Sequence, residues 1–284
     1  PCEKGCYRAA ADGAVSIRAL HRSVAEAEAG AGAEARPVAA PATGKRIAIV
    51  GAGPAGLSCA YYLSLLGHAC AILDEREAPG GMLRYGADPA VLPPDVLARE
   101  IGAIRALGVE IRTGCRVGTQ QGLDELAARS DAVVLATGAR AEGLAWPFAV
   151  GANDAGVEAD ARTFATSRAR VFACGGAIGV CRLAAKAVGQ GRLAAESVHR
   201  FVMGVEGMRE PLPERRFDSR LGKPDADELR RLLATDLASF RPQGKAGGAF
   251  PDSAAEAAGR CMQCDCGKKD ACALRAYAHA YAID

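Results

Sequence analysis

A glycine-rich turn between a short apolar run and a helical pattern constrains this chain more than any other feature. Residues 47–50 form a run typical of a buried strand, and the turn after it contains Gly51, Gly53, Pro54, Ala55 and Gly56. The first glycine permits a tight turn, the second lets the backbone approach a pyrophosphate, and the third lets the helix pack on the strand. The N–H groups at the helix start favour phosphate. The pattern therefore predicts a nucleotide-binding βαβ unit.

An acidic residue at the end of the next predicted strand completes this pattern. A helical pattern extends to Gly67, a second apolar run covers residues 70–73, and Asp74 follows it. An acid about 20 residues after the glycines can bind ribose hydroxyls. Since strand, helix and acid are all present, a dinucleotide site is favoured over an ordinary tight turn. The turn alone does not decide between NAD and FAD.

The chain beyond this unit continues to alternate between helical patterns and apolar runs, which is typical of a parallel sheet. The predicted elements are helices at about 95–107 and 183–201 and strands at 109–112, 133–135 and 171–173. We therefore expect an α/β fold with a single Rossmann-like domain, flanked by small helical segments that contain cysteines. The expected divisions are an N-terminal segment at 1–29, a linker at 30–44, the main domain at 45–205 and a C-terminal extension at 206–284.

Composition excludes several classes of partner. The 35 Lys and Arg against 33 Asp and Glu leave a net charge of +2, which does not indicate nucleic acid. The chain has no run of about 18 apolar residues, so membrane insertion is not expected. It begins at Pro1 without a secretory pattern, so we expect missing or removed upstream residues and a reducing, cytoplasmic location. The four histidines are scattered and suggest no role.

Three further motifs occur in a fixed order along the chain. They are Ala78-Pro-Gly-Gly-Met-Leu83, Ala136-Thr-Gly138 and Val171-Phe-Ala-Cys-Gly-Gly176. Together with the glycine-rich turn they resemble the FAD domain of flavoproteins with two dinucleotide-binding domains. Within that superfamily the chain is similar to the small subunit of glutamate synthase, the flavin part of dihydropyrimidine dehydrogenase and ferredoxin–NADP transhydrogenase subunits. The resemblance includes the N-terminal cysteine segment at 2–6 and the residues that follow it at 15–20.

The resemblance implies an FAD site. The glycine-rich turn would hold the pyrophosphate, and Asp74 would hold the adenosine ribose with Arg76 nearby. Gly81, Met82 and Leu83 would lie beside the flavin, although Met82 and Leu83 also fit a plain core and Arg76 a solvated charge. The other residues that the resemblance implies are Val117 near the adenine, Ala136, Thr137 and Gly138 at a crossing strand end, and Gly176 and Ala177 at the ribityl and pyrimidine end.

Two departures from the family pattern limit what the resemblance implies. The family usually has Asp where this chain has Ala177, which removes a hydrogen-bond partner of the ribityl chain. The family also inserts an NAD(P)H domain between the Ala-Thr-Gly and Val-Phe-Ala motifs. Only residues 139–170 lie there, fewer than the roughly 50 residues of a compact domain, and the glycines at 151 and 156 suggest a loop. We therefore expect FAD binding without NAD(P)H binding.

The eleven cysteines gather partly near the two ends, which favours metal or iron–sulfur ligation over a disulfide framework. Near the C-terminus, Cys261, Cys264, Cys266 and Cys272 form a set of four thiols that suits a [4Fe–4S] cluster or tetrahedral zinc. The C-x-C step is unusual for a zinc ribbon, and attachment to a flavoprotein favours iron–sulfur. Zinc and plain reduced thiols remain alternatives.

A second cysteine pair lies at the N-terminus. Cys2 and Cys6 make half a site, and relatives have further cysteines just upstream, so the resemblance implies a second [4Fe–4S] cluster. Its other ligands would be missing from this sequence, or come from the C-terminal segment or another chain. A vestigial site is the alternative. Cys59 and Cys70 fall on packed positions and are expected in the core.

These patterns predict an FAD and [4Fe–4S] electron-transfer subunit of a larger oxidoreductase. Its partners would be other oxidoreductase subunits or ferredoxin-like carriers, and no catalytic proton-transfer residue is required. One alternative is a free-standing NAD(P)H-dependent flavin reductase. The other is a non-catalytic scaffold subunit with zinc, which Ala177 favours.

Overall fold

The chain divides into two units in the computed structural model, residues 36–214 and residues 1–35 with 215–284. The structure describes residues 3, 6–10, 13–30, 38–139, 147–205, 227, 230, 231, 234 and 254–261. The boundaries expected after residues 29, 44 and 205 stay predictions.

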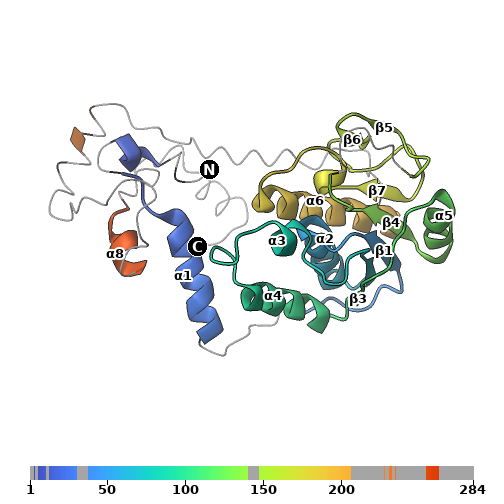
Figure 1. The fold of residues 1–284 in the computed structure, drawn as a ribbon, viewed down its shortest axis with the longest axis horizontal. Coiled ribbons are helices and arrows are strands. Elements are labelled where there is room, and N and C mark those ends of the chain that lie inside the picture. Colours follow the sequence, from blue (N-terminus) through green and yellow to red (C-terminus); the bar gives the residue numbers. More distant parts are fainter. Residues whose placement is uncertain are drawn as a thin grey trace. The chain divides into compact units, whose positions relative to one another are not determined.

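A parallel sheet forms the centre of the larger unit (Figure 1). Its strands are β1 Arg46–Val50, β2 Ala69–Leu73, β3 Glu110–Arg112, β4 Ala132–Leu135 and β7 Val171–Ala173. Their order is β3-β2-β1-β4-β7, and every neighbouring pair is parallel. The predicted α/β fold with a Rossmann-like domain is thereby confirmed.

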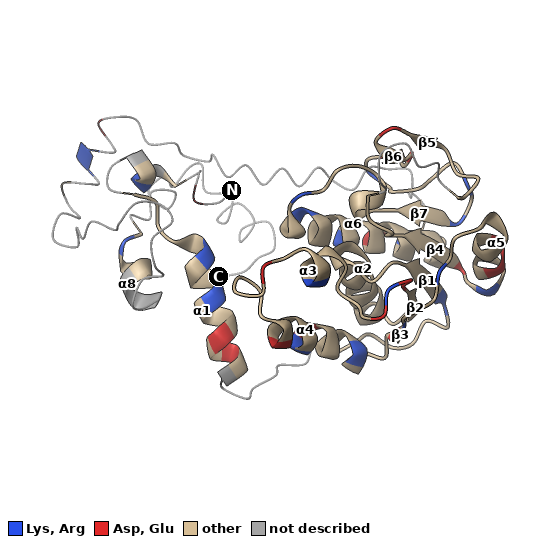
Figure 2. Cartoon of the chain, in the orientation of Figure 1, with Lys and Arg blue, Asp and Glu red and all other residues tan. Residues whose placement is uncertain are grey.

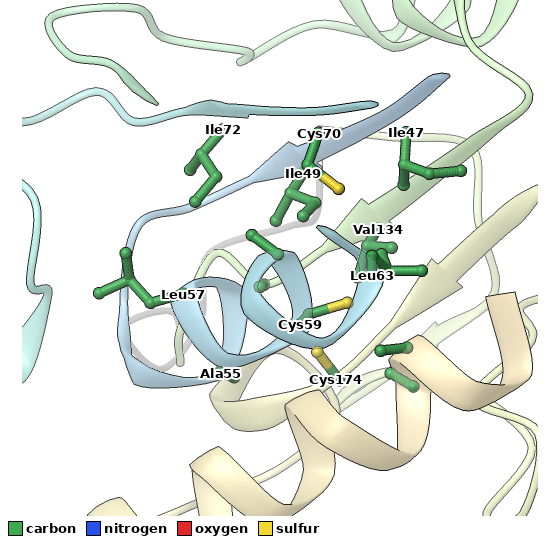
Figure 3. Close-up of a cluster of buried hydrophobic side chains, with 14 of the residues drawn as sticks. Ile47, Ile49, Ala55, Leu57, Cys59, Leu63, Cys70, Ile72, Val134 and Cys174 are labelled. Atoms are coloured by element: carbon green, nitrogen blue, oxygen red, sulfur yellow. The ribbon is translucent and has the colours of Figure 1, made fainter. Parts of the chain in front are cut away.

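Helices cover both faces of this sheet because alternate strand residues point to opposite faces. Ile47 and Ile49 face the core below α2 Pro54–Leu65, α4 Pro94–Ala106 and α6 Ala184–Met203. Figure 3 shows part of this core, which contains Cys59 and Cys70 as predicted. Ala48 and Val50 face the other core, which α5 Gln120–Arg129 covers through the fully buried Leu123.

Close packing of α6 on α2 depends on small residues. A Cβ atom added at Gly191 would lie 2.2 Å from the carbonyl oxygen of Ala55. Beside this crossing, Ser58 Oγ donates a hydrogen bond of 2.8 Å to the carbonyl of Val188. Since Ala55 lies in the first turn of α2, α6 fixes the end of the helix that follows the glycine-rich turn.

Several short elements were not predicted from the sequence. They are α3 Met82–Tyr85, α5, the 3-10 helix η3 Gly175–Ala177, and the hairpin strands β5 Ala152–Asn153 and β6 Gly156–Val157. The helix α5 does have a sequence signal, because Thr119 precedes it and its hydroxyl accepts a 3.1 Å hydrogen bond from Gly122 N–H. Thr is a favoured N-cap residue.

The smaller unit brings the two cysteine-bearing segments into contact. Its described elements are η2 Tyr7–Ala10, α1 Ile17–Gly30 and α8 Ala254–Gly259. Arg8, two residues after Cys6, is buried and donates to the carbonyl of Arg260, the residue before Cys261. The Arg260 guanidinium donates in turn to the Gly13 carbonyl at 3.2 Å. The N-terminal and C-terminal segments therefore pack together around these arginines.

Two histidines meet at the amino end of β2, a contact that the sequence did not indicate. The Nε2 atom of the buried His68 lies 2.8 Å from Nδ1 of His199 on α6. On its other side, His68 Nδ1 lies 2.6 Å from Thr43 Oγ1. Burial lowers the pKa of His68, and so does the neighbouring His199, while Asp131 opposes and Lys45 adds to that lowering.

Burial of His68, together with the neighbouring His199, makes the stability of the folded chain depend on pH. The unfolded chain binds a proton at His68 near about pH 6.5, whereas the folded chain resists it, so the free energy of unfolding should fall as the pH falls below that value. The midpoint temperature of thermal unfolding should fall less steeply for His68→Gln than for the wild type as the pH is lowered from about 7.5 to about 5.5. Equal slopes for wild type and His68→Gln would contradict this account.

Candidate functional site

The candidate site lies at the carboxyl ends of the parallel strands. Gly51 follows β1, Asp74 follows β2, Ala136 follows β4 and Cys174 follows β7. The helix α2, which follows β1, packs on one face of the sheet, whereas α5 covers the other face. Ligands of open parallel sheets bind where the strand order reverses, which here is between β1 and β4.

Two glycines of the turn are required by its close contacts. Gly51 has φ +109°, and a Cβ atom there would lie 2.3 Å from the carbonyl oxygen of Ala136. At Gly56 a Cβ atom would lie 2.0 Å from the Gly51 carbonyl oxygen. The tight turn at Gly51 and the close packing at Gly56 are therefore confirmed as the sequence predicted.

The start of α2 has the character of a phosphate site. Gly53 is the N-cap residue, it makes no side-chain cap, and Pro54 begins the helix. The first N–H groups of any α-helix lack intrahelical partners, and the helix dipole places positive charge there. A Cβ atom added at Gly53 would have Gly81 Cα, at 4.0 Å, as its nearest neighbour. The backbone at Gly53 is therefore open to close approach by an anion.

Asp74 binds the turn as well as facing the site. Its Oδ2 accepts a 2.6 Å hydrogen bond from Ala52 N–H, and its Oδ1 accepts one of 2.8 Å from Arg76 N–H. A carboxylate has about four acceptor positions, so lone pairs remain for ribose hydroxyls. The sequence indicated the ribose role of Asp74. It gave no sign of the hydrogen bond to Ala52, because that contact depends on how β1 and β2 pair.

The segment after Asp74 returns to the glycine-rich turn. Gly80 N–H donates a 2.8 Å hydrogen bond to the Ala52 carbonyl. A Cβ atom at Gly81, which has φ +51°, would lie 2.7 Å from Gly53 Cα. Met82 is 66% exposed, whereas Leu83 packs against the core. Gly81 and Met82 thus border the turn, and the plain-core alternative fits Leu83 only.

Arg76 has a partner that the sequence did not reveal. Its guanidinium lies 4.4 Å from the centre of the Tyr85 ring, close enough for a cation–π contact. The Tyr85 hydroxyl also donates to the Ala78 carbonyl at 3.2 Å. These contacts hold the segment between β2 and α3 beside the site.

The opposite side of the turn is bordered by the ends of β4 and β7. A Cβ atom at Gly176 would lie 2.8 Å from Ala139 N and 3.1 Å from Gly138 Cα, so these predicted residues do meet. A Cβ atom at Gly175 would lie 2.5 Å from Ala55 Cβ, a contact that sequence reasoning missed. Ala177 is fully buried and has no polar side chain to offer. Of the remaining predicted residues, Thr137 is exposed beside Ala136, and Val117 packs against the core under α5.

Three thiols of the larger unit, Cys59, Cys70 and Cys174, are buried and protonated. Burial raises the pKa of Cys174 to about 12 and that of Cys70 to about 11. Burial also raises the pKa of Cys59 well above its usual value. Figure 3 shows the Cys59 and Cys174 side chains in the apolar core. Because thiolates are the reactive form, these residues serve packing.

The predicted metal ligands fall mostly outside the described residues. The structure describes two of the predicted ligands: Cys6 is half-buried and Cys261 is exposed. Cys2, Cys264, Cys266 and Cys272 lie outside the described residues. Among the residues that the structure describes, no three His, Cys, Asp or Glu side chains form a metal site. The metal prediction therefore remains untested.

The connection between β4 and β7 contains a small hairpin. Within the described parts of residues 136–170, β5 pairs with β6 and a single bridge joins Ala159 to Thr166; a further bridge joins Ala165 to Phe172 of β7. Gly156 lies at the start of β6, so this glycine belongs to a hairpin. In the described part of the chain, no helix is long and apolar enough to span a membrane.

Comparison with known proteins places this geometry in context. A family model described as pyridine nucleotide-disulphide oxidoreductase matches residues 20–191. The chain is 41% identical over 164 residues to the beta subunit of NADP(+)-dependent formate dehydrogenase from Moorella thermoacetica, covering 50% of this chain and 23% of that protein. It is 35% identical over 140 residues to the small chain of NADPH glutamate synthase from Bacillus subtilis, covering 49% and 28%.

A third relative is the PreT subunit of NAD-dependent dihydropyrimidine dehydrogenase from Salmonella typhimurium, at 36% identity over 137 residues, covering 48% of this chain and 33% of that subunit. The resemblance drawn from the motifs is thereby confirmed. The chain spans no more than 33% of the length of these three curated relatives.

Proposed function

This chain belongs to the pyridine nucleotide-disulphide oxidoreductase family, and from that premise we propose that it is an FAD-containing electron-transfer subunit of a larger oxidoreductase. The observation that supports this most is the open backbone at Gly53, at the uncapped start of α2 and beside the Asp74 carboxylate. In that arrangement the helix N–H groups would bind the pyrophosphate, and Asp74 would bind the adenosine ribose.

The residues around the turn fit a flavin dinucleotide. Gly81 and Met82 would border the flavin on one side, with Gly138 and Gly176 on the other, and a Cβ atom added at Gly138 would meet nothing within 4 Å. The Ala177 methyl cannot accept the hydrogen bond that the family's Asp accepts. Backbone groups would then hold the ribityl chain. When bound, FAD supplies exchange between two-electron and one-electron transfer.

We propose that nicotinamide does not bind to this chain. The relatives are named for NAD or NADP, yet the chain between β4 and β7 is limited to residues 136–170. Compact domains need roughly 50 residues or more. Electrons from a nicotinamide would therefore reach this chain through another domain or subunit, and oxidoreductase subunits or ferredoxin-like carriers are the partners that we propose.

We also propose that Cys261, Cys264, Cys266 and Cys272 bind a [4Fe–4S] cluster and that Cys2 and Cys6 take part in a second. The contact between Arg8 and the Arg260 carbonyl supports a common location, because it joins the segments that contain Cys6 and Cys261. Thiolate ligands require a reducing environment, so we propose a cytoplasmic location.

An anaerobic titration tests this function. The purified full chain should contain flavin, iron and acid-labile sulfide, and dithionite should bleach the flavin absorption. Equimolar NADH or NADPH should leave the flavin oxidised over minutes. Rapid reduction by either nucleotide would instead support the free-standing reductase, and zinc without flavin would support the scaffold subunit.

A further inference from the structure

The amino-terminal half of α6 and the loop before it form an unusual surface next to the candidate site. This loop follows Gly176 and Ala177 directly, and η3 contacts α2 through Gly175 and Ala55. We call the surface made by Val180, Arg182, Leu183, Lys186 and Leu193 the α6-start surface. Lys186 and Leu193 are seven residues apart on α6 and therefore share one side of that helix, whereas Val180, Arg182 and Leu183 precede its first residue, Ala184.

Large apolar side chains are exposed on the α6-start surface. Val180 is 69% exposed, Leu183 is 50% exposed and Leu193 is 39% exposed. Single exposed apolar residues are ordinary, but a group beside a ligand site is typical of an interaction surface. On the other flank of the glycine-rich turn, Met82 and Tyr85 of α3 are also exposed.

The charge of the α6-start surface has one sign. Residues 161–195 contain no Asp or Glu, whereas Arg182 and Lys186 are both exposed. Neither has an ion-pair partner among the described residues. Figure 2 shows Lys and Arg at the start of α6. The acidic residues Glu75 and Glu77 lie on the other flank, before α3. The surface therefore attracts negative charge.

We propose that the α6-start surface docks a small acidic electron-transfer protein, an inference that rests on the proposed function. Transient electron-transfer complexes have small interfaces, and complementary charge steers their association. A basic and apolar patch adjoining the flavin end of the site provides both features. The negative charge of the partner would face Arg182 and Lys186, and its apolar contacts would cover Val180 and Leu183.

Charge reversal tests this surface without disturbing the fold. The double variant Arg182→Glu with Lys186→Glu places acids at the start of a helix, where the dipole favours them. The matched control is Arg105→Glu with Arg129→Glu, which reverses two exposed arginines at the ends of α4 and α5. Both double variants change the net charge by the same amount. A difference between their ferredoxin affinities therefore shows that the position of the reversed charges matters.

The readout is the dissociation constant of an oxidised acidic ferredoxin from the full-length, FAD-loaded chain, with basic cytochrome c as the opposite probe. At about 50 mM salt, the wild type and control should bind ferredoxin alike, and the α6 variant about tenfold or more weakly. At about 0.5 M salt the difference should disappear. The α6 variant should also gain affinity for cytochrome c.

Three results would overturn the proposal. They are equal ferredoxin affinity for the α6 variant and the control, no ferredoxin binding by the wild type, and self-association of the wild type that the α6 variant abolishes. The last would assign the surface to a second copy of this chain. FAD content is measured on the same samples, so a protein that holds FAD but fails to bind ferredoxin refutes the docking surface and leaves the proposed function standing.

Discussion

The Gly56→Ala variant is expected to lose FAD binding and to lower the free energy of unfolding by about 3 kcal/mol. A Cβ atom at this position would lie 2.0 Å from the Gly51 carbonyl oxygen and 3.3 Å from Ala136 Cβ. The first of these contacts is with backbone, so no side-chain rotation relieves it. The helix α2 would have to move away from β1, and its first N–H groups would move with it.

Urea unfolding and FAD titration measure the two effects separately. The control is Gly102→Ala in α4, where an added Cβ atom meets nothing within 4 Å. That variant should gain up to about 1 kcal/mol from the better helix propensity of alanine and should bind FAD like the wild type. Wild-type stability and FAD affinity in Gly56→Ala would show that the turn does not have the close packing described above.

Asp74→Ala is expected to weaken FAD binding about 100-fold, equivalent to about 2.7 kcal/mol. The variant removes acceptors for the ribose hydroxyls and also leaves Ala52 N–H and Arg76 N–H without their carboxylate partner. Hydrogen bonds to charged groups each contribute about 1.5–3 kcal/mol. The loss of the Ala52 contact would also loosen the turn between β1 and α2.

Flavin fluorescence titration measures this affinity, and circular dichroism shows whether the variant is folded. Asp74→Asn keeps one acceptor oxygen and should lie between the wild type and Asp74→Ala. Glu75→Ala is the matched control, because this neighbouring acid makes an exposed ion pair with Arg116 at 3.4 Å. If Asp74→Ala lowered stability yet kept its FAD affinity, Asp74 would hold the turn only and the ribose role would be rejected.

The parts of the site that the sequence predicted are those determined by local geometry. The close contact between Gly56 and the Gly51 carbonyl follows from a strand, a tight turn and a helix that are contiguous in the chain. Asp74 follows from its place at the end of β2. These features depend on few long-range contacts, so the spacing of residues is sufficient to predict them.

The features that the sequence did not predict depend on residues that are far apart in the chain. His68 and His199 meet because α6 packs along α2 and brings His199 to the loop that precedes β2. Gly175 meets Ala55 for a similar reason, since β7 and β1 both flank β4. Neither pair has a local signal. The ligand set of Cys261 was inferred from spacing alone, and its other three residues lie outside the described residues.

Titration of the FAD-free chain with FAD, followed by flavin fluorescence, tests the central claim most directly. The account predicts saturation at one FAD per chain, competition by ADP-ribose at the pyrophosphate and ribose positions, and loss of binding in Gly56→Ala. Failure to saturate, or equal binding by the wild type and Gly56→Ala, would contradict a flavin site at the start of α2.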